Sequence, residues 1–379
     1  PQNEVIAGVR VIKARALREK PDSFVAYMLD YLMFFVALTL HLTLHPKRYE
    51  LIHINNMPDF LVFAAWLPKL FGVPIIHDIH DLMPEIYMEK FSVSEKHVAI
   101  RFLLWQERLA AKMADVVLTV EERLRDILSD RGIPRSKIHV LINLPDESIF
   151  RPIPQKPRKK KGDKFVLVYH GTLARRLGLD LALEAVAAVK QKIPDLEFRI
   201  IGAGEERDRL LRLREAFGLQ HVVKFSEGFV PVEAIPDALS DADLGVVPLR
   251  PSPGTDIMLP TKLLEYVQMG IPCAVPKTQT IARYFNDTMV RFFEADHAES
   301  LAEAIFDLYS HPQKRRKLAD SAAAGFLSRY RWNEHKRVYI NLAERLLRRS
   351  AANADEFVVD ALPQPAESAV KRSARKRKQ

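Results

Sequence analysis

A chain of 379 residues is longer than one ordinary α/β core needs and suits two domains of moderate size. Its composition, 48% hydrophobic and 28% charged, is typical of a globular protein. The single cysteine, Cys273, excludes an internal disulfide framework and fits a reducing compartment. The net charge of +9 comes from basic runs in residues 156–164 and 371–379, and the rest of the chain is slightly acidic. This distribution argues against a nucleic-acid-binding protein and leaves contact with an anionic membrane surface open.

The first 150 residues alternate between short apolar strands and helices. Strands are predicted over residues 9–12, 51–54, 73–76, 116–119 and 138–142, and helices over 59–71, 97–113 and 122–131. Strand–helix–strand repetition at this spacing is typical of parallel, doubly wound sheets. Ligands of such sheets bind at the carboxyl ends of the strands, so the residues that follow each strand are the candidates for function.

Residues 23–45 form the most apolar stretch, with Asp30 as its only formal charge. A bilayer span needs roughly 20 apolar residues. The uncharged part, residues 31–44, is shorter than that and contains His41. We therefore expect a helix that is largely buried in the protein, with a helix at a membrane interface as the alternative.

Residues 150–164 contain several prolines and a basic run without apolar periodicity, which indicates a hinge between domains. The alternation then restarts, with strands over 165–169, 197–201, 222–225 and 244–248, another beginning at Ala274, and helices over 179–190, 205–217, 232–239, 298–310, 312–329 and 333–348. The predicted organisation is a first domain over 1–150, a hinge over 151–164, a second domain over 165–330, a helix over 331–350 that packs back on the first domain, and a disordered basic tail over 351–379.

Residues 254–276 predict an anion site. Pro260 suits the start of a helix, Thr261 can cap it, and Gly270 ends it. The first turn then offers N–H groups beside Lys262, which favours a phosphate. Glu265 follows at i+3 on the same face and could hold sugar hydroxyls. The alternative is an ordinary helix with a solvated Lys–Glu pair.

Polar side chains also follow two strands of the first domain. The segment HDIHD at residues 77–81 could bind a metal, serve in acid–base or sugar-binding roles, or form structural hydrogen bonds. Glu85 could join the same cleft or cap the next helix. Asn56 follows the preceding strand, where a helix cap explains it equally well.

Three loops after strands of the second domain could surround a nucleotide. Gly171 allows close backbone approach, and Arg175 and Arg176 could neutralise a diphosphate or remain solvated. The G-x-G at Gly202 lacks the third glycine of a dinucleotide fingerprint but suits a tight turn beside a nucleotide. Phe229 and Val230 could lie against a base.

Taken in order, these segments resemble the retaining GT-B glycosyltransferases of the large family four. The resemblance rests on NNMPDFLVF at residues 55–63, HDIHDLMPE at 77–85, HGTLARRLG at 170–178, IIGAGEE at 200–206, ADLGVVPLR at 242–250 and LPTKLLEYVQMGIP at 259–272. It implies an α/β fold of GT-B type, in which two Rossmann-like, doubly wound domains face a central cleft.

The resemblance implies roles residue by residue. Glu265 matches the second glutamate of the family's E-x₇-E motif, which holds the nucleotide ribose. The first glutamate falls on Ile257, so the neighbouring Asp256 is the candidate to replace it at the donor sugar. Thr261 and Lys262 match the helix tip at the diphosphate.

Two more roles concern the reacting groups. The family usually places an arginine and a lysine in the loop after the second domain's first strand. Thr172 and Leu177 hold those positions here, so the adjacent Arg176 is expected to supply the charge. His80 matches the histidine near the donor's anomeric centre.

The predicted site therefore has His80, Arg176 and Lys262 as catalytic residues; Gly171, Thr172, Arg175, Gly202, Phe229, Val230, Asp256, Leu259, Thr261 and Glu265 as donor-binding residues; Asn56, Asp81 and Glu85 on the acceptor side; and no metal.

The resemblance also implies an absence. Family members open with a strand and a glycine-rich loop upstream of anything that matches residues 9–12. That part of the acceptor side is expected to be missing from the sequence, which leaves open whether the chain is active alone.

The implied reaction moves a sugar from a nucleotide diphosphate sugar to an acceptor hydroxyl with retention, in cell-surface glycan or glycolipid synthesis, without a cofactor. The acceptor would be a glycan or lipid-linked, and the protein cytoplasmic, with peripheral contact at the inner membrane face. The alternatives are a nucleotide-sugar epimerase on a similar scaffold and a non-catalytic partner protein that binds nucleotide sugars.

Overall fold

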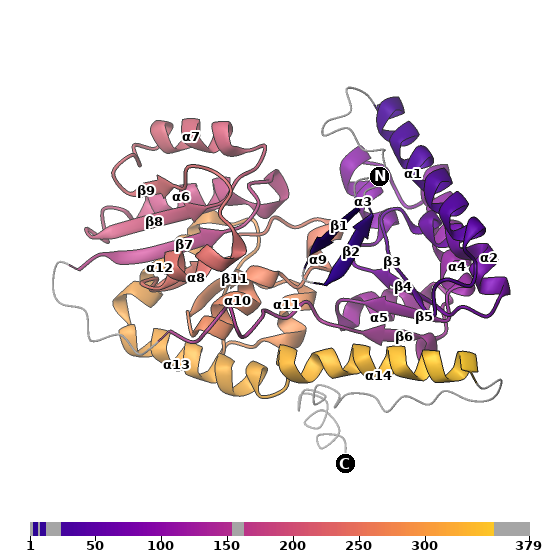
Figure 1. Ribbon diagram of the computed structural model, residues 1–379. Helices are drawn as coiled ribbons and strands as arrows, with labels where there is room; N and C mark the ends of the chain where they lie inside the picture. The colour runs from indigo at the N-terminus through magenta and orange to yellow at the C-terminus, as the bar shows by residue number, and fades with distance from the viewer. Residues whose placement is uncertain (1–2, 7, 13–23, 154–162, 352–379) are drawn as a thin grey trace, which may run out of the picture.

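The computed structural model describes residues 3–6, 8–12, 24–153 and 163–351, which form two α/β domains side by side and a last helix that leaves the C-terminal domain and runs along the N-terminal domain (Figure 1). The N-terminal domain holds a four-stranded sheet and the C-terminal domain a six-stranded sheet. All strand pairs in these two sheets are parallel. Most of the predicted hinge and nearly all of the predicted basic tail lie outside the described residues.

The sheet of the N-terminal domain consists of β3 (Ile52–Asn55), β4 (Ile75–Ile79), β5 (Val116–Thr119) and β6 (Ile138–Val140), in that spatial order. β4 and β5 are buried along their whole length, as parallel strands are when both faces of a sheet are covered. The register pairs Asn55 with Asp78, so the polar residues at the ends of β3 and β4 reach the same edge of the sheet.

The connections between these strands are helical. The predicted helix over 59–71 is a 3₁₀ segment, η1 (Asp59–Ala65), that runs into a short α2 (Trp66–Leu70). The other connections contain α3 (Met83–Phe91), α4 (Val98–Met113) and α5 (Glu122–Asp130).

Helix α1 (Phe24–Leu44) is less buried than the sequence predicts. Its inner face, with Phe35, Leu38 and Leu42, packs on the domain core. Its outer face is exposed at positions three or four residues apart, which are Leu29, Leu32, Met33, Val36, Leu40 and Leu44. The prediction of a largely buried helix is therefore wrong, because a helix that is apolar all round does not reveal whether a second layer covers its outer face. Among the described residues, no helix combines the length and apolarity needed to cross a membrane.

The strand predicted over residues 9–12 is present as β2 (Val9–Ile12), but it lies outside the parallel sheets. It pairs antiparallel with β1 (Asn3–Ile6), which the sequence did not predict. Val5 and Val9 of this hairpin are exposed.

The sheet of the C-terminal domain has the order β12-β11-β10-β7-β8-β9. Its strands are β7 (Phe165–His170), β8 (Leu196–Ile201), β9 (Val223–Phe225), β10 (Leu244–Val246), β11 (Cys273–Pro276) and β12 (Arg291–Phe293). The chain runs outward from β7 to β9 and returns on the other side of β7 with β10. This reversal opens a crevice at the carboxyl ends of β7 and β10, where doubly wound sheets bind ligands.

Helices cover both faces of this sheet (Figure 1). They are α6 (Leu179–Val189), α7 (Arg207–Ala216), α8 (Ile235–Leu239), α9 (Pro253–Asp256), α10 (Thr261–Met269), α11 (Gln279–Tyr284), α12 (Ala298–Ser310) and α13 (Pro312–Ala322), with shorter turns η3 (Arg175–Leu177), η4 (Val232–Ala234) and η5 (Ala323–Leu327).

The last helix, α14 (Trp332–Ala351), crosses from the C-terminal domain and packs along the N-terminal domain (Figure 1). Leu342 and Leu346 are buried against Ile76 of β4 and Leu118 of β5. His335 of the same helix accepts a 3.0 Å hydrogen bond from a backbone N–H of the segment after β6. Burial lowers the pKa of His335 to about 4, so this imidazole is neutral. The helix therefore ties the two domains together.

Candidate active site

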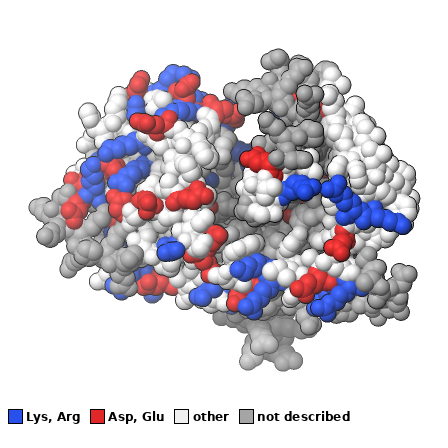
Figure 2. Space-filling view, in the orientation of Figure 1, with Lys and Arg blue, Asp and Glu red and all other residues white. Residues whose placement is uncertain are grey.

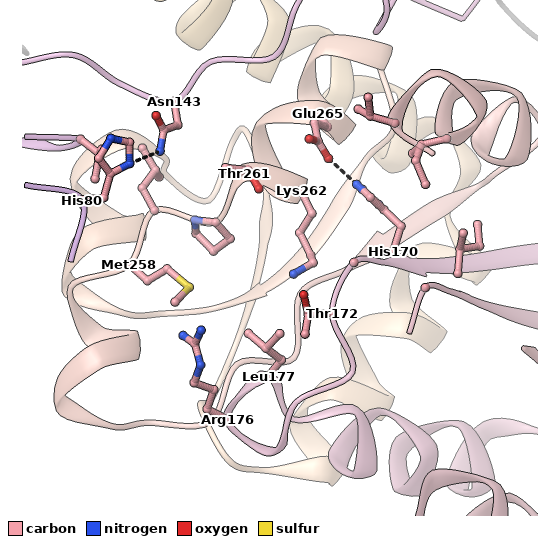
Figure 3. Close-up of a pocket in the computed structure, with 18 of the residues that line it drawn as sticks. His80, Asn143, His170, Thr172, Arg176, Leu177, Met258, Thr261, Lys262 and Glu265 are labelled. Atoms are coloured by element: carbon pink, nitrogen blue, oxygen red, sulfur yellow. Dashed lines mark hydrogen bonds and ion pairs between the residues drawn. The ribbon is translucent and has the colours of Figure 1, made fainter. Parts of the chain in front are cut away.

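A cleft of about 510 Å³ lies between the domains, at the carboxyl ends of their strands. Figure 3 shows that side chains from both domains face into it. Of the residues predicted for the site, the cleft is lined by His80, Asp81, Gly171, Thr172, Arg176, Gly202, Phe229, Val230, Leu259, Thr261, Lys262 and Glu265.

The N-terminus of α10 forms one wall. Pro260 takes the N-cap position and Thr261 begins the helix, so the threonine does not cap it as the sequence suggested. Pro260 has no side-chain group that could accept a hydrogen bond from the first turn of α10, so the helix has no side-chain cap at this residue. Its orphan N–H groups and the positive end of the helix dipole are therefore available to an anion in the cleft.

Lys262 extends from this first turn toward the loop after β7. Its Nζ lies 4.8 Å from the centre of the Tyr169 ring. A Cβ on Gly171, whose φ is +116°, would lie 3.3 Å from Lys262 Cε, so the glycine leaves room for the lysine chain. Burial, reinforced by the nearby Arg176, lowers the pKa of Lys262 to about 8 despite the opposing effect of Glu265.

Arg176 is the second cation in the cleft. It lies in η3, and Figure 3 shows its guanidinium pointing into the cleft beside Met258. Within the described residues, neither Arg176 nor Lys262 forms an ion pair with a carboxylate at contact distance. Two cations without close counter-charges next to a helix N-terminus make this part of the cleft strongly attractive to a diphosphate.

Close backbone contacts build the wall beside these cations. Gly202, at φ +139°, packs so tightly that an added Cβ would lie 2.1 Å from the carbonyl oxygen of Gly171. Its N–H donates a 2.9 Å hydrogen bond to Ser226 Oγ, which joins the loops after β8 and β9. Both glycines of the G-x-G segment are therefore required by close backbone contacts, since an added Cβ on Gly204 would lie 2.3 Å from the Leu173 carbonyl oxygen.

Glu265 lies one turn along α10 from the cations. Its carboxylate pairs with Nε2 of His170, the last residue of β7 (Figure 3). Both residues line the cleft, but His170 is buried, while the Glu265 side chain stays partly accessible. A carboxylate held in this way can accept hydrogen bonds from sugar hydroxyls.

Across the cleft, His80 follows β4 in the N-terminal domain. Its Nε2 lies 3.1 Å from Asp78 Oδ2, and this hydrogen bond raises the pKa of His80. Nδ1 faces Asn143 Nδ2 at 3.5 Å (Figure 3). His80 therefore reaches the cleft at the end that both domains line.

Four residues predicted for the site do not line the cleft. Asn56 is a structural crosslink, because its amide donates to the Asp81 carbonyl at 2.6 Å and accepts from the His80 N–H at 3.0 Å. Glu85 is buried in an ion pair with Arg131 and does not line the cleft, unlike the acceptor-side position that the sequence suggested.

The other two belong to the C-terminal domain. Arg175 is exposed, whereas the next two residues of η3, Arg176 and Leu177, line the cleft. Asp256 pairs with Arg123 of α5 at 3.1 Å and links the two domains. Asp256 does not line the cleft, whereas Ile257 faces it and packs with the cluster that contains Leu124.

Sequence reasoning missed His170 and Asn143. His170 ends β7 and Asn143 lies just after β6, and these strand ends were the available signal, but neither residue had a role assigned to it. Within the described ranges, no group of three His, Cys, Asp or Glu side chains is placed to hold a metal ion.

Solved structures with this arrangement show which class of fold it is. Sucrose-phosphate synthase from Thermosynechococcus elongatus superimposes with a TM-score of 0.72 at 20% identity, covering 91% of this chain and 85% of that one. HepE of Anabaena, solved in complex with UDP, superimposes with a TM-score of 0.61 at 17% identity, covering 84% of both chains. The fold is therefore GT-B, as predicted.

Sequence comparison identifies the family. The model of the glycosyl transferase 4-like domain matches residues 1–143, and that of the glycosyl transferases group 1 matches residues 150–324. The chain therefore belongs to the group 1 glycosyltransferases, which confirms the predicted family. Alpha-D-kanosaminyltransferase of Streptomyces kanamyceticus is 26% identical over 281 residues, which is 72% of this chain and 70% of that protein. Several other curated relatives match over less than two thirds of their own length.

Proposed function

We propose that this chain transfers a sugar from a nucleotide diphosphate sugar to an acceptor hydroxyl with retention of the anomeric configuration. One observation carries the proposal: the uncapped N-terminus of α10, Lys262 and Arg176 converge on one cleft between the domains. This arrangement suits a diphosphate. Glu265 would then hold the ribose of the nucleoside, with Phe229 and Val230 beside the base, and the sugar would lie toward His80.

The chemistry follows from the charges. The bond from the anomeric carbon to the diphosphate breaks as the bond to the acceptor oxygen forms on the same face, and the departing phosphate oxygen takes the hydroxyl proton. Negative charge grows on the leaving diphosphate, where the two cations and the helix N–H groups stabilise it. Removing one such group typically costs about 3 kcal/mol of transition-state stabilisation.

A thermal-shift screen with UDP, GDP, ADP and dTDP tests the diphosphate site. A ligand at about 100 times its Kd adds about 2.7 kcal/mol to the free energy of unfolding. Arg176→Met should abolish most of this shift, whereas the matched change Arg175→Met, one residue outside the cleft, should preserve it. No stabilisation by any diphosphate, or equal loss in both variants, would contradict the proposed site.

Turnover of the matching nucleotide sugars separates the candidate activities. A transferase forms a glycosylated product only when an acceptor is present. Conversion of the donor to an isomer without an acceptor would indicate the epimerase, and donor binding without any turnover would indicate a non-catalytic binding protein.

We further propose that the protein acts at the cytoplasmic face of a membrane, on a glycan or lipid-linked acceptor in cell-surface glycan synthesis. The supporting observation is the exposed apolar face of α1, which Figure 2 shows as an uncharged surface. Lys47 follows this helix and lies over the ring of the exposed Phe71, and Trp66 is exposed nearby in sequence on α2. Apolar, aromatic and basic side chains in this combination suit an anionic lipid surface.

Co-sedimentation with phosphatidylglycerol vesicles tests the membrane proposal. The protein should pellet with these vesicles and less with phosphatidylcholine alone. The double change Val36→Gln and Leu40→Gln should release it, while Ile340→Gln, an exposed apolar residue of α14, should not. A protein that stays in the supernatant, or a dimer that the α1 changes dissociate, would refute it.

A further inference from the structure

A chain of hydrogen bonds connects the C-terminal helix to the cleft. Tyr339 of α14 places its hydroxyl 2.9 Å from Nδ1 of His53 on β3. Nε2 of His53 lies 3.1 Å from Asp78 Oδ2 on β4, and Nε2 of His80 lies 3.1 Å from the same oxygen. Hydrogen bonds thus connect β3, β4 and α14 behind His80, which lines the cleft from the N-terminal domain.

The partners define which atoms carry hydrogens. Burial alone would raise the pKa of Asp78, but hydrogen bonds from His53 and His80 outweigh it and lower the pKa to about 2. The carboxylate is therefore ionised and only accepts, so Nε2 of each histidine donates to it. Nδ1 of His53 then accepts from the Tyr339 hydroxyl. When the His80 ring is neutral, its Nδ1 therefore carries the lone pair, and this atom lies 3.5 Å from Asn143 Nδ2 at the cleft.

We propose that Asp78, His53 and Tyr339 are positioning residues that hold His80 with its Nδ1 lone pair directed into the cleft. The His80 side chain is 41% exposed, so packing alone does not fix its ring, whereas the Asp78 side chain is 10% exposed. A buried carboxylate that orients an exposed imidazole determines both its rotamer and its tautomer. The hydrogen bonds that hold His80 do not depend on the proposed function. The group that the lone pair binds does depend on it, and this group is a hydroxyl of the donor sugar or of the acceptor.

The arrangement makes the cleft depend on α14. Tyr339 belongs to the helix that crosses from the C-terminal domain, so docking of that helix completes the chain of hydrogen bonds. The other charged group near His80 in the N-terminal domain is Asp81, which also raises its pKa. Arg176 and Lys262 line the same cleft from the C-terminal domain.

Nitrogen-15 spectroscopy of the histidine rings tests the proposal without any substrate. The His80 signals are assigned by their loss in His80→Gln. In the wild type, the pKa of His80 should lie above the ordinary value, and at a pH above that pKa the neutral ring should be the Nε2–H tautomer. Asp78→Asn should bring the pKa down, and Tyr339→Phe should change it in the same direction by less. An Nδ1–H tautomer, or a pKa that is identical in the wild type and Asp78→Asn, would overturn the proposal.

Tyr49→Phe is the matched control. Tyr49 also bonds a histidine, with its hydroxyl 2.7 Å from Nε2 of His41, but neither residue lines the cleft. This variant should leave the His80 signals unchanged. If Asp78→Asn does not fold, Tyr339→Phe still decides the outcome, because it removes one oxygen from a partly exposed helix and leaves Asp78 in place.

Turnover gives the functional readout, measured as UDP released from UDP-glucose. Asp78→Asn should lower kcat about 10- to 100-fold and Tyr339→Phe by less, with KM changed by less than about twofold. Thermal shifts by UDP should stay at the wild-type level in both variants. Equal losses in Tyr49→Phe would refute a positioning role. If even the wild type binds none of the four nucleoside diphosphates and turns over none of the matching nucleotide sugars, the proposed function fails, and the histidine spectra still decide the arrangement.

Discussion

Lys262 should make the affinity of the cleft for a nucleoside diphosphate depend on pH above neutrality. Burial is the main cause that lowers the pKa of this lysine to about 8, from an ordinary value of 10.5. About nine tenths of the molecules therefore carry the charge at pH 7, and about one tenth at pH 9. A bound diphosphate supplies a nearby negative charge, so binding raises the pKa of Lys262 and takes up a proton.

The magnitude follows from this linkage. If the pKa of the bound lysine returns to its ordinary value, the Kd for UDP rises about tenfold between pH 7 and pH 9. Calorimetry in two buffers of different ionisation enthalpy measures the proton uptake, which should be about half a proton at pH 8 and close to one at pH 9.

Stability without ligand should show the opposite trend. The unfolded chain keeps the lysine proton up to about pH 10.5, whereas the folded chain releases it near pH 8. The contribution of Lys262 to the free energy of unfolding therefore increases as the pH rises between these two values.

Three variants complete the test. Lys262→Arg keeps its charge throughout this range, so its Kd should be nearly independent of pH. Lys262→Met should bind weakly at every pH, and the exposed Lys277→Met should keep the wild-type slope. A full pH slope in Lys262→Met would refute the assignment of the titration to this side chain.

Three further changes give distinct outcomes. Gly202→Ala should lower the free energy of unfolding, measured by urea titration, by at least about 2 kcal/mol. The reason is that the added Cβ would lie 2.1 Å from the Gly171 carbonyl oxygen. Gly228→Ala is the control and should change this free energy little, because the space around Gly228 is open. Glu265→Gln should weaken UDP binding by about 1–3 kcal/mol and remove the preference for UDP over 2′-deoxy-UDP if the carboxylate holds the ribose; a preserved preference would exclude that role. Phe229→Ala, at a ring that is 82% exposed, should weaken UDP binding without changing the melting temperature, and an unchanged Kd would remove the ring from the base site.

Local patterns in the sequence predicted most of the framework. The apolar runs and their Gly and Pro boundaries place α10 within a residue or two, because Pro260 and Gly270 act through the backbone conformation of their own segment. The expectation that function lies after strands also follows from topology alone. This expectation correctly placed two features at the cleft, which are the loop after β7 and His80 after β4, without any knowledge of side-chain contacts.

The partners of individual side chains depended on the tertiary structure. Glu85 and Asp256 were assigned to the site by their neighbours in sequence, yet each pairs with an arginine 46 or 133 positions away. Arg175 and Arg176 are adjacent, and the 3₁₀ turn directs only one of them into the cleft.

The sequence by itself therefore determined the strands, the helices and the edge of each sheet where ligands bind, since these depend on local periodicity and chain direction. Only the tertiary structure decided which charges converge, that Tyr339 reaches His53, and that one face of α1 is exposed. Such contacts join segments far apart in the chain, and no periodicity within a single segment specifies them.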